Sequence, residues 1–75
     1  MEPYANHGGD SGVVAFECGP GRISVQFVDG SVYLYTAKRP GTAVVAEMQR
    51  LAALGQGLSG YISRVVQKNY AKKLR

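Results

Sequence analysis

The chain has few of the residues that cross-link small proteins or bind metals. It has one cysteine, Cys18, which excludes an internal disulfide, and one histidine, His7, which leaves too few ligands for a structural zinc site. No apolar run is longer than residues 13–16, far short of the roughly 20 residues that a membrane-spanning helix needs. We therefore expect no metal, no cofactor and no membrane contact, with stability coming from packing or self-association.

Acidic residues are also scarce, and their spacing argues against catalysis. The five carboxylates are Glu2, Asp10, Glu17, Asp29 and Glu47. No two of them are spaced as an acid/base couple, and Cys18 has no histidine nearby in an ordered segment to activate it. The sequence predicts that the protein is not an enzyme.

The beginning of the chain carries no targeting signal that we recognise. Residues 1–11 lack the apolar core of a signal peptide, and the absence of a disulfide framework fits a reducing compartment, so we expect a cytoplasmic protein. The same residues are polar and without periodicity, which predicts a disordered N-terminal arm. Residues 12–75 are expected to form a single domain.

Three segments alternate apolar and polar residues and predict antiparallel strands. They are residues 13–18, 23–28 and 31–36. The last two flank Asp29-Gly30, the strongest short signal for a β-hairpin. A two-residue turn at this point would pair Val25 with Leu34.

This register divides the side chains between two faces of the sheet. The core face would hold Val14, Phe16, Cys18, Ile23, Val25, Phe27, Val32 and Leu34. Tyr33 and Tyr35 would then lie on the opposite, open face.

Two helical segments follow the strands. Thr42 is expected to cap a helix that runs to about Leu54, and Ser59 a second helix over residues 60–73. Apolar residues recur at helical spacing in both, so both can cover the apolar sheet face. The expected fold class is α+β: a three-stranded antiparallel β-meander followed by two short α-helices packed on one sheet face.

Between the helices, residues 55–60 satisfy the spacing of a dinucleotide-binding glycine motif. That motif needs a preceding strand, whereas a helix precedes it here. We interpret Gly55 as the end of the first helix and the following residues as a turn.

The order of these pieces resembles the KTSC domain, a small domain also found at the C-terminus of some lysyl-tRNA synthetases. The residues that carry the resemblance are Asp29, Gly30, Tyr33, Tyr35, Tyr61, Ile62 and Tyr70. The chain departs from the family pattern at Gln67, where the family has arginine. The resemblance implies a single KTSC-like domain over residues 12–75, and the link to a tRNA enzyme suggests RNA binding by association alone.

Positive charge is concentrated near the C-terminus. Nine Lys and Arg stand against five Asp and Glu, for a net charge of +4. The candidate phosphate-binding cations are Arg64, Lys68, Lys72, Lys73 and Arg75, which Lys38 and Arg39 would extend. Most of them recur at helical spacing, which predicts a basic face on the last helix. Such a face either binds a polyanion or only keeps the helix solvated.

Tyr33 and Tyr35 support the same hypothesis, because aromatic side chains on an open sheet stack nucleic-acid bases. The leading hypothesis is therefore a non-enzymatic binding or accessory module for RNA or another polyanion. Two other interpretations of the tyrosines stay open: packing across the sheet, or burial in a dimer contact. The alternative function is accordingly a protein-interaction or homodimerisation domain that uses the Tyr33/Tyr35 sheet face.

Overall fold

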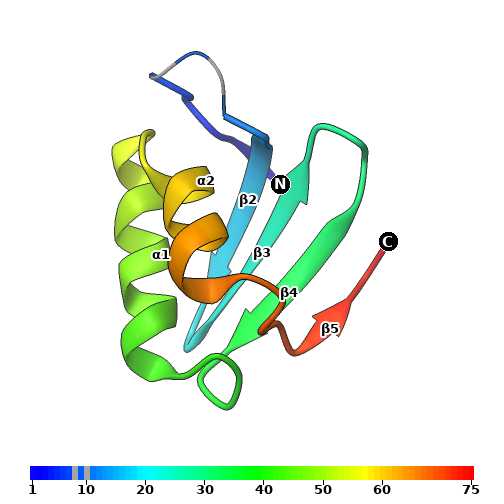
Figure 1. Cartoon of the computed structure of the whole chain (residues 1–75), viewed down its shortest axis with the longest axis vertical. Coiled ribbons are helices and arrows are strands. Elements are labelled where there is room, and N and C mark those ends of the chain that lie inside the picture. The colour runs from blue at the N-terminus through cyan, green and yellow to red at the C-terminus, as the bar shows by residue number, and fades with distance from the viewer. Residues whose placement is uncertain (8, 10) are drawn as a thin grey trace.

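A five-stranded antiparallel sheet with helices on one side accounts for the fold (Figure 1). The computed structural model describes residues 1–7, 9 and 11–75. In chain order the elements are β1 (Glu2–Pro3), β2 (Val13–Gly19), β3 (Arg22–Phe27), β4 (Val32–Thr36), α1 (Thr42–Leu54), α2 (Leu58–Tyr61), the π-helical turn η1 (Ile62–Val66) and β5 (Lys72–Lys73). The strands lie in the sheet in the order of the chain. The expected α+β class is confirmed, and two short edge strands enlarge the predicted meander.

The hairpin between β3 and β4 has a three-residue loop instead of the predicted two-residue turn. The Phe27 N–H donates to the Ser31 carbonyl at 2.9 Å, so the loop comprises Val28, Asp29 and Gly30. Gly30 has φ 89°, the left-handed conformation that ends loops of this length. The Asp29 carboxylate holds the loop by accepting hydrogen bonds from the Ser31 N–H at 2.9 Å and the Ser31 hydroxyl at 2.6 Å.

The extra loop residue shifts β4 by one position against β3. Val25 lies opposite Tyr33, and not opposite Leu34 as predicted. Because successive side chains of a strand alternate between faces, this shift reverses every side chain of β4. Tyr33 and Tyr35 consequently face the helices, whereas Val32 and Leu34 face away from them.

The pairing of β2 with β3 is as predicted at one end and different at the other. Phe16 lies opposite Val25, as expected. A bulge near the start of β2 then places Val13, and not Val14, opposite Phe27. Val13 is buried at 1% exposure, whereas Val14 is exposed.

Residues 2–7 pack against the rest of the domain, in a region where the sequence predicted a disordered arm. Glu2 and Pro3 pair with β2 as an edge strand. Tyr4 is 6% exposed, and its hydroxyl accepts a hydrogen bond from the Leu58 N–H at 3.2 Å. The His7 N–H donates to the carbonyl at the end of α1 at 2.7 Å. Burial of the Tyr4 side chain thus anchors a segment that has no periodic pattern of apolar residues. Gly8 and Asp10 of the expected arm lie outside the described residues.

The first helix, α1, matches its predicted bounds, although Thr42 is its first residue and not its cap. The cap is Gly41, with no side-chain hydrogen bond. At the other end Gly55 has φ 84° and donates its N–H to the Leu51 carbonyl, as the prediction of a helix end required.

The second helical segment is much shorter than the predicted 60–73. It begins after Gly57, so Ser59 is not its cap, and it ends at Val66 because Gln67 adopts φ 52°. The chain then returns to the sheet as β5, with the Ala71 N–H donating to the Leu34 carbonyl at 2.8 Å. The backbone groups at the free edge of β4 offer hydrogen bonds to this part of the chain. Residues 72 and 73 therefore pair with β4 as a strand and do not continue the helix.

The core lies between the sheet and the helical layer. Its buried residues are Tyr4, Val13, Phe16, Ile23, Val25, Tyr35, Val45, Met48, Leu51, Ala52, Leu58, Ile62 and Val66. Cys18, predicted to be in the core, is exposed at the end of β2. Within the described residues, no helix has the length and apolar character needed to cross a bilayer.

Replacement of Tyr4 tests whether the N-terminal segment belongs to the folded domain. We expect Tyr4→Ala to lower the free energy of unfolding in urea by about 3–5 kcal/mol, because it leaves a cavity in the core. Tyr4→Phe should cost about 1 kcal/mol, because it leaves the Leu58 N–H without its acceptor. Glu2→Ala, exposed in the same segment, should change stability by less than about 0.5 kcal/mol. An unchanged unfolding midpoint for Tyr4→Ala would contradict the docking of this segment.

Candidate functional site

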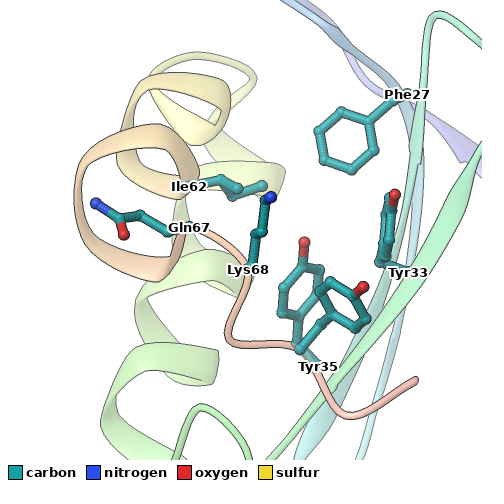
Figure 2. A pocket seen from close by; sticks show the side chains of 7 residues that line it. Phe27, Tyr33, Tyr35, Ile62, Gln67 and Lys68 are labelled. Atoms are coloured by element: carbon teal, nitrogen blue, oxygen red, sulfur yellow. The ribbon is translucent and has the colours of Figure 1, made fainter. Parts of the chain in front are cut away.

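An aromatic cavity opens between β4 and the segment that joins η1 to β5 (Figure 2). Its volume is about 370 Å³. We call it the tyrosine cavity, and its lining residues are Phe27, Tyr33, Tyr35, Ile62, Gln67, Lys68 and Tyr70. Figure 2 shows Lys68 extending beside Ile62 with Phe27 and Tyr33 across from it, while the Gln67 side chain points away from the rings.

The tyrosine cavity depends on the register of the β3–β4 hairpin. Tyr33 and Tyr35 alternate with Leu34 along β4, so both rings point toward the helices. Tyr70 immediately precedes Ala71, whose N–H donates to the Leu34 carbonyl. It therefore lies at the start of the segment that runs antiparallel to β4. The pairing of β5 with β4 therefore brings together tyrosines that are far apart in the sequence.

The rings contact one another mostly edge to face, the geometry that aromatic side chains prefer. The Tyr33 and Tyr70 centroids lie 4.6 Å apart with the planes tilted by 52°. Tyr70 meets Tyr35 at 6.4 Å and 86°, and Phe27 meets Tyr33 at 5.7 Å and 74°. Tyr35 is only 1% exposed, whereas Tyr33 and Tyr70 are half-buried, so the last two present ring surface to a ligand.

Burial also changes the acidity of the innermost tyrosine. The pKa of Tyr35 is raised to about 12, first by desolvation and then by the neighbouring Tyr33 and Tyr70. Its phenol is therefore neutral over the physiological range and can donate a hydrogen bond into the tyrosine cavity.

The structure distributes the predicted cations over several elements and not along one helix. Lys68 lines the tyrosine cavity, and the Lys73 Nζ lies 5.7 Å from the centroid of the Tyr33 ring. The charge of Lys73 also contributes, after the hydrogen bonds from Ser31, to the lowered pKa of Asp29. Two of the five predicted cations thus lie next to the predicted tyrosines.

The other three cations lie elsewhere. Arg64 is on η1, where its Nε donates to the Gly60 carbonyl at 3.2 Å. Lys72 pairs with Leu34 and so shares the sheet face turned away from the helices. The Arg75 carbonyl accepts a hydrogen bond from the Val32 N–H at 3.1 Å. The predicted basic helical face is wrong, because the chain leaves the helix at Val66.

A further cation approaches the tyrosine cavity from the turn before α1. The Arg39 Nε donates to the Asn69 carboxamide oxygen at 2.9 Å, and Asn69 lies between two lining residues. Arg39 therefore lies beside the segment that lines the tyrosine cavity, whereas Lys38 is exposed in the turn before α1.

Sequence reasoning missed the roles of Phe27 and Tyr70. The sequence placed Phe27 on the core face of the sheet and Tyr70 within the second predicted helix, whereas each lines the tyrosine cavity. The one local signal against a continuous helix around Tyr70 is Asn69, a weak helix former that favours turns. The interpretation of Tyr33 and Tyr35 as an exposed dimer face is also wrong, because the rings lie between sheet and helices.

The remaining chemically reactive groups are isolated. The pKa of the exposed Cys18 thiol is raised by desolvation and by the nearby Glu2 carboxylate, which makes the thiol a weaker nucleophile. In the part of the chain that the structure describes, no three His, Cys, Asp or Glu side chains are grouped as metal ligands.

No protein-family model matches the chain, and no curated protein or solved structure shows significant similarity to it. The resemblance to the KTSC domain therefore stays a prediction from the residues that carry it. The case for a function depends on the tyrosine cavity and its surroundings.

Alkaline titration tests the burial of Tyr35. A group whose pKa is higher in the folded than in the unfolded chain stabilises the fold below its unfolded pKa, and this contribution is lost as pH rises through the folded pKa. We expect stability to fall between about pH 10 and about pH 12, with a phenol that ionises near 12 in tyrosinate absorbance. Tyr35→Phe should remove that late ionisation; its persistence in the variant would contradict the assignment.

Proposed function

We propose that the protein is a non-enzymatic module that binds single-stranded RNA, with a base in the tyrosine cavity and phosphates on the surrounding cations. The observation that carries the proposal is the convergence of Tyr33, Tyr35 and Tyr70 with Lys68 and Lys73. These residues come from two segments that the pairing of β4 with β5 brings together. Exposed aromatic surface beside positive charge is the usual composition of a single-strand binding site.

The size and composition of the tyrosine cavity suit an aromatic ligand. Its volume of about 370 Å³ falls within the range of small-molecule sites. Tyr33 and Tyr70 offer half-buried ring surface on which a base can stack, and stacking on one aromatic side chain contributes about 1–3 kcal/mol. The neutral Tyr35 phenol can donate a hydrogen bond to a base carbonyl.

Charge around the tyrosine cavity supports an anionic partner. Lys68 and Lys73 flank it, Arg39 approaches through Asn69, and the chain carries a net charge of +4. None of the lining residues is a carboxylate, imidazole or thiol. The proposal is therefore binding without chemistry on the bound strand.

We also propose that the chain is a KTSC domain. Tyr33, Tyr35 and Tyr70 carry part of that resemblance, and all three line the tyrosine cavity. Because residues that carry the resemblance also line one cavity, they support a binding function for a domain of this kind.

Adjacent lysines on opposite faces of the sheet provide a matched test of the interface. We expect Lys73→Glu to weaken binding of a short labelled oligouridylate at least about tenfold in fluorescence anisotropy, because a cation beside the Tyr33 ring is replaced by a repelling charge. Lys68→Glu should act similarly. Lys72→Glu makes the same change of charge on the other sheet face and should reduce affinity by no more than about twofold.

The salt dependence adds a second readout. With three phosphate contacts, log K against log salt should have a slope of about −2, since each contact contributes about −0.7 on a single strand. Equal losses for Lys72→Glu and Lys73→Glu would show that only net charge matters and would contradict the tyrosine cavity as the site.

Removal of one ring separates stacking from attraction to charge. We expect Tyr33→Leu, which keeps apolar volume, to weaken oligouridylate binding about tenfold, consistent with the loss of one stacked base. Heparin has negative charge but no bases, so its binding should not change. Tyr61→Leu is the control, because Tyr61 packs against the core without lining the tyrosine cavity. Equal loss of heparin and RNA binding would refute base stacking.

A further inference from the structure

The helices cover only one face of the sheet and leave the other without a partner (Figure 1). The side chains that the register assigns to this open face are Pro3, Ala15, Glu17, Ser24, Gln26, Val32, Leu34, Lys72 and Leu74. Leu74 is 48% exposed, and with Met1 and Val32 it borders a shallow hollow of about 370 Å³ on this face. The tyrosine cavity lies on the other side of the sheet.

The open face consists of two rows that run straight across the strands. The first row is Glu17, Ser24, Leu34 and Lys72, which are successive cross-strand partners. The second row is Pro3, Ala15, Gln26, Val32 and Leu74, with the Leu74 N–H donating to the Val32 carbonyl at 2.7 Å. The first row thus carries a negative charge at one end, a positive charge at the other and uncharged groups between.

The two charges at the ends of the first row have no ion-pair partner among residues 1–7, 9 and 11–75. Glu17 and Lys72 are both exposed, and two intervening strands separate them within one copy. At about 4.8 Å between strands, that distance is too long for an ion pair within the chain.

We propose that a second copy of this chain covers the open face, related by a two-fold axis that runs parallel to the strands between β3 and β4. This rotation reverses the order of the strands, so β2 of one copy lies over β5 of the other. Glu17 then meets Lys72 of the partner subunit, and the symmetry repeats the pair at the other edge. Leu34 lies between these pairs, where the interface excludes water, and Val32 beside it is already buried within one copy.

The distribution of charge selects this arrangement from the other two-fold packing. An axis perpendicular to the strands places β2 over β2 and β5 over β5. The two glutamates would then share one edge and the two lysines the other, and like charges side by side disfavour association. The same face is therefore complementary to itself in only one of the two orientations.

A weak dimer of this kind needs only a small interface. The smallest specific interfaces bury about 500 Å² on each partner, roughly a ninth of the 4472 Å² that this chain exposes. Association through the sheet edges is the competing mode, but β1 and β5 have two residues each, and short edge strands resist it. We expect dissociation in the micromolar range, where interfaces of this size are common.

A charge exchange between the two ends of the first row tests the proposal. We expect sedimentation velocity of the wild-type chain to show a monomer–dimer equilibrium at micromolar concentrations. Glu17→Lys or Lys72→Glu alone places like charges at both edges and should weaken the dimer at least about tenfold. The double variant restores opposite charges and should recover the wild-type dissociation constant within about threefold.

Controls separate this face from effects of net charge. Glu47→Lys on α1 and Lys38→Glu before it change charge by the same amounts outside the open face and should leave the dimer unchanged. Leu34→Lys should abolish the dimer while the circular dichroism spectrum stays native, because Leu34 is only partly buried. A wild-type chain that is monomeric at several hundred micromolar would overturn the proposal. A double charge exchange as weak as the single variants, or a dimer that survives Leu34→Lys, would overturn it too.

Discussion

The length of one hairpin loop determines which chemistry each face of the sheet presents. Asp29 binds both the N–H and the hydroxyl of Ser31, and Gly30 supplies the left-handed residue that a three-residue loop needs. A loop shorter by one residue would turn Tyr33 and Tyr35 outward. The tyrosine cavity and the composition of the open face are therefore both consequences of a few hydrogen bonds at an exposed turn.

Local patterns in the sequence were enough to locate this turn, the three central strands and α1. They were not enough to count the residues in the loop, because β4 can place apolar groups on either face. Val32 and Leu34 are aliphatic, while Tyr33 and Tyr35 have largely apolar rings, so both registers gather hydrophobic side chains. An alternating pattern of side chains identifies a strand, but its register can be predicted only where its two faces differ in polarity.

The elements that sequence reasoning missed are the two short edge strands. Two residues are too few for a periodic pattern, and each strand forms because a neighbouring strand offers unpaired hydrogen-bonding groups. Lys72 and Lys73 are good helix formers, which made a continued helix the natural prediction. Tertiary pairing with β4 overrode that preference, and it also brought Lys73 to the Tyr33 ring.

The glycine at the end of α1 limits which substitutions the fold can accept. Gly55 has φ 84°, a conformation that side chains with a Cβ rarely adopt. A Cβ built there would also lie 2.7 Å from the Cβ of Ala5 and 2.8 Å from the Cδ2 of His7. The same glycine thus ends α1 and leaves room for the N-terminal segment to pack closely against it. Among homologous chains that keep both features, this position should tolerate no exchange, even though it does not line the tyrosine cavity.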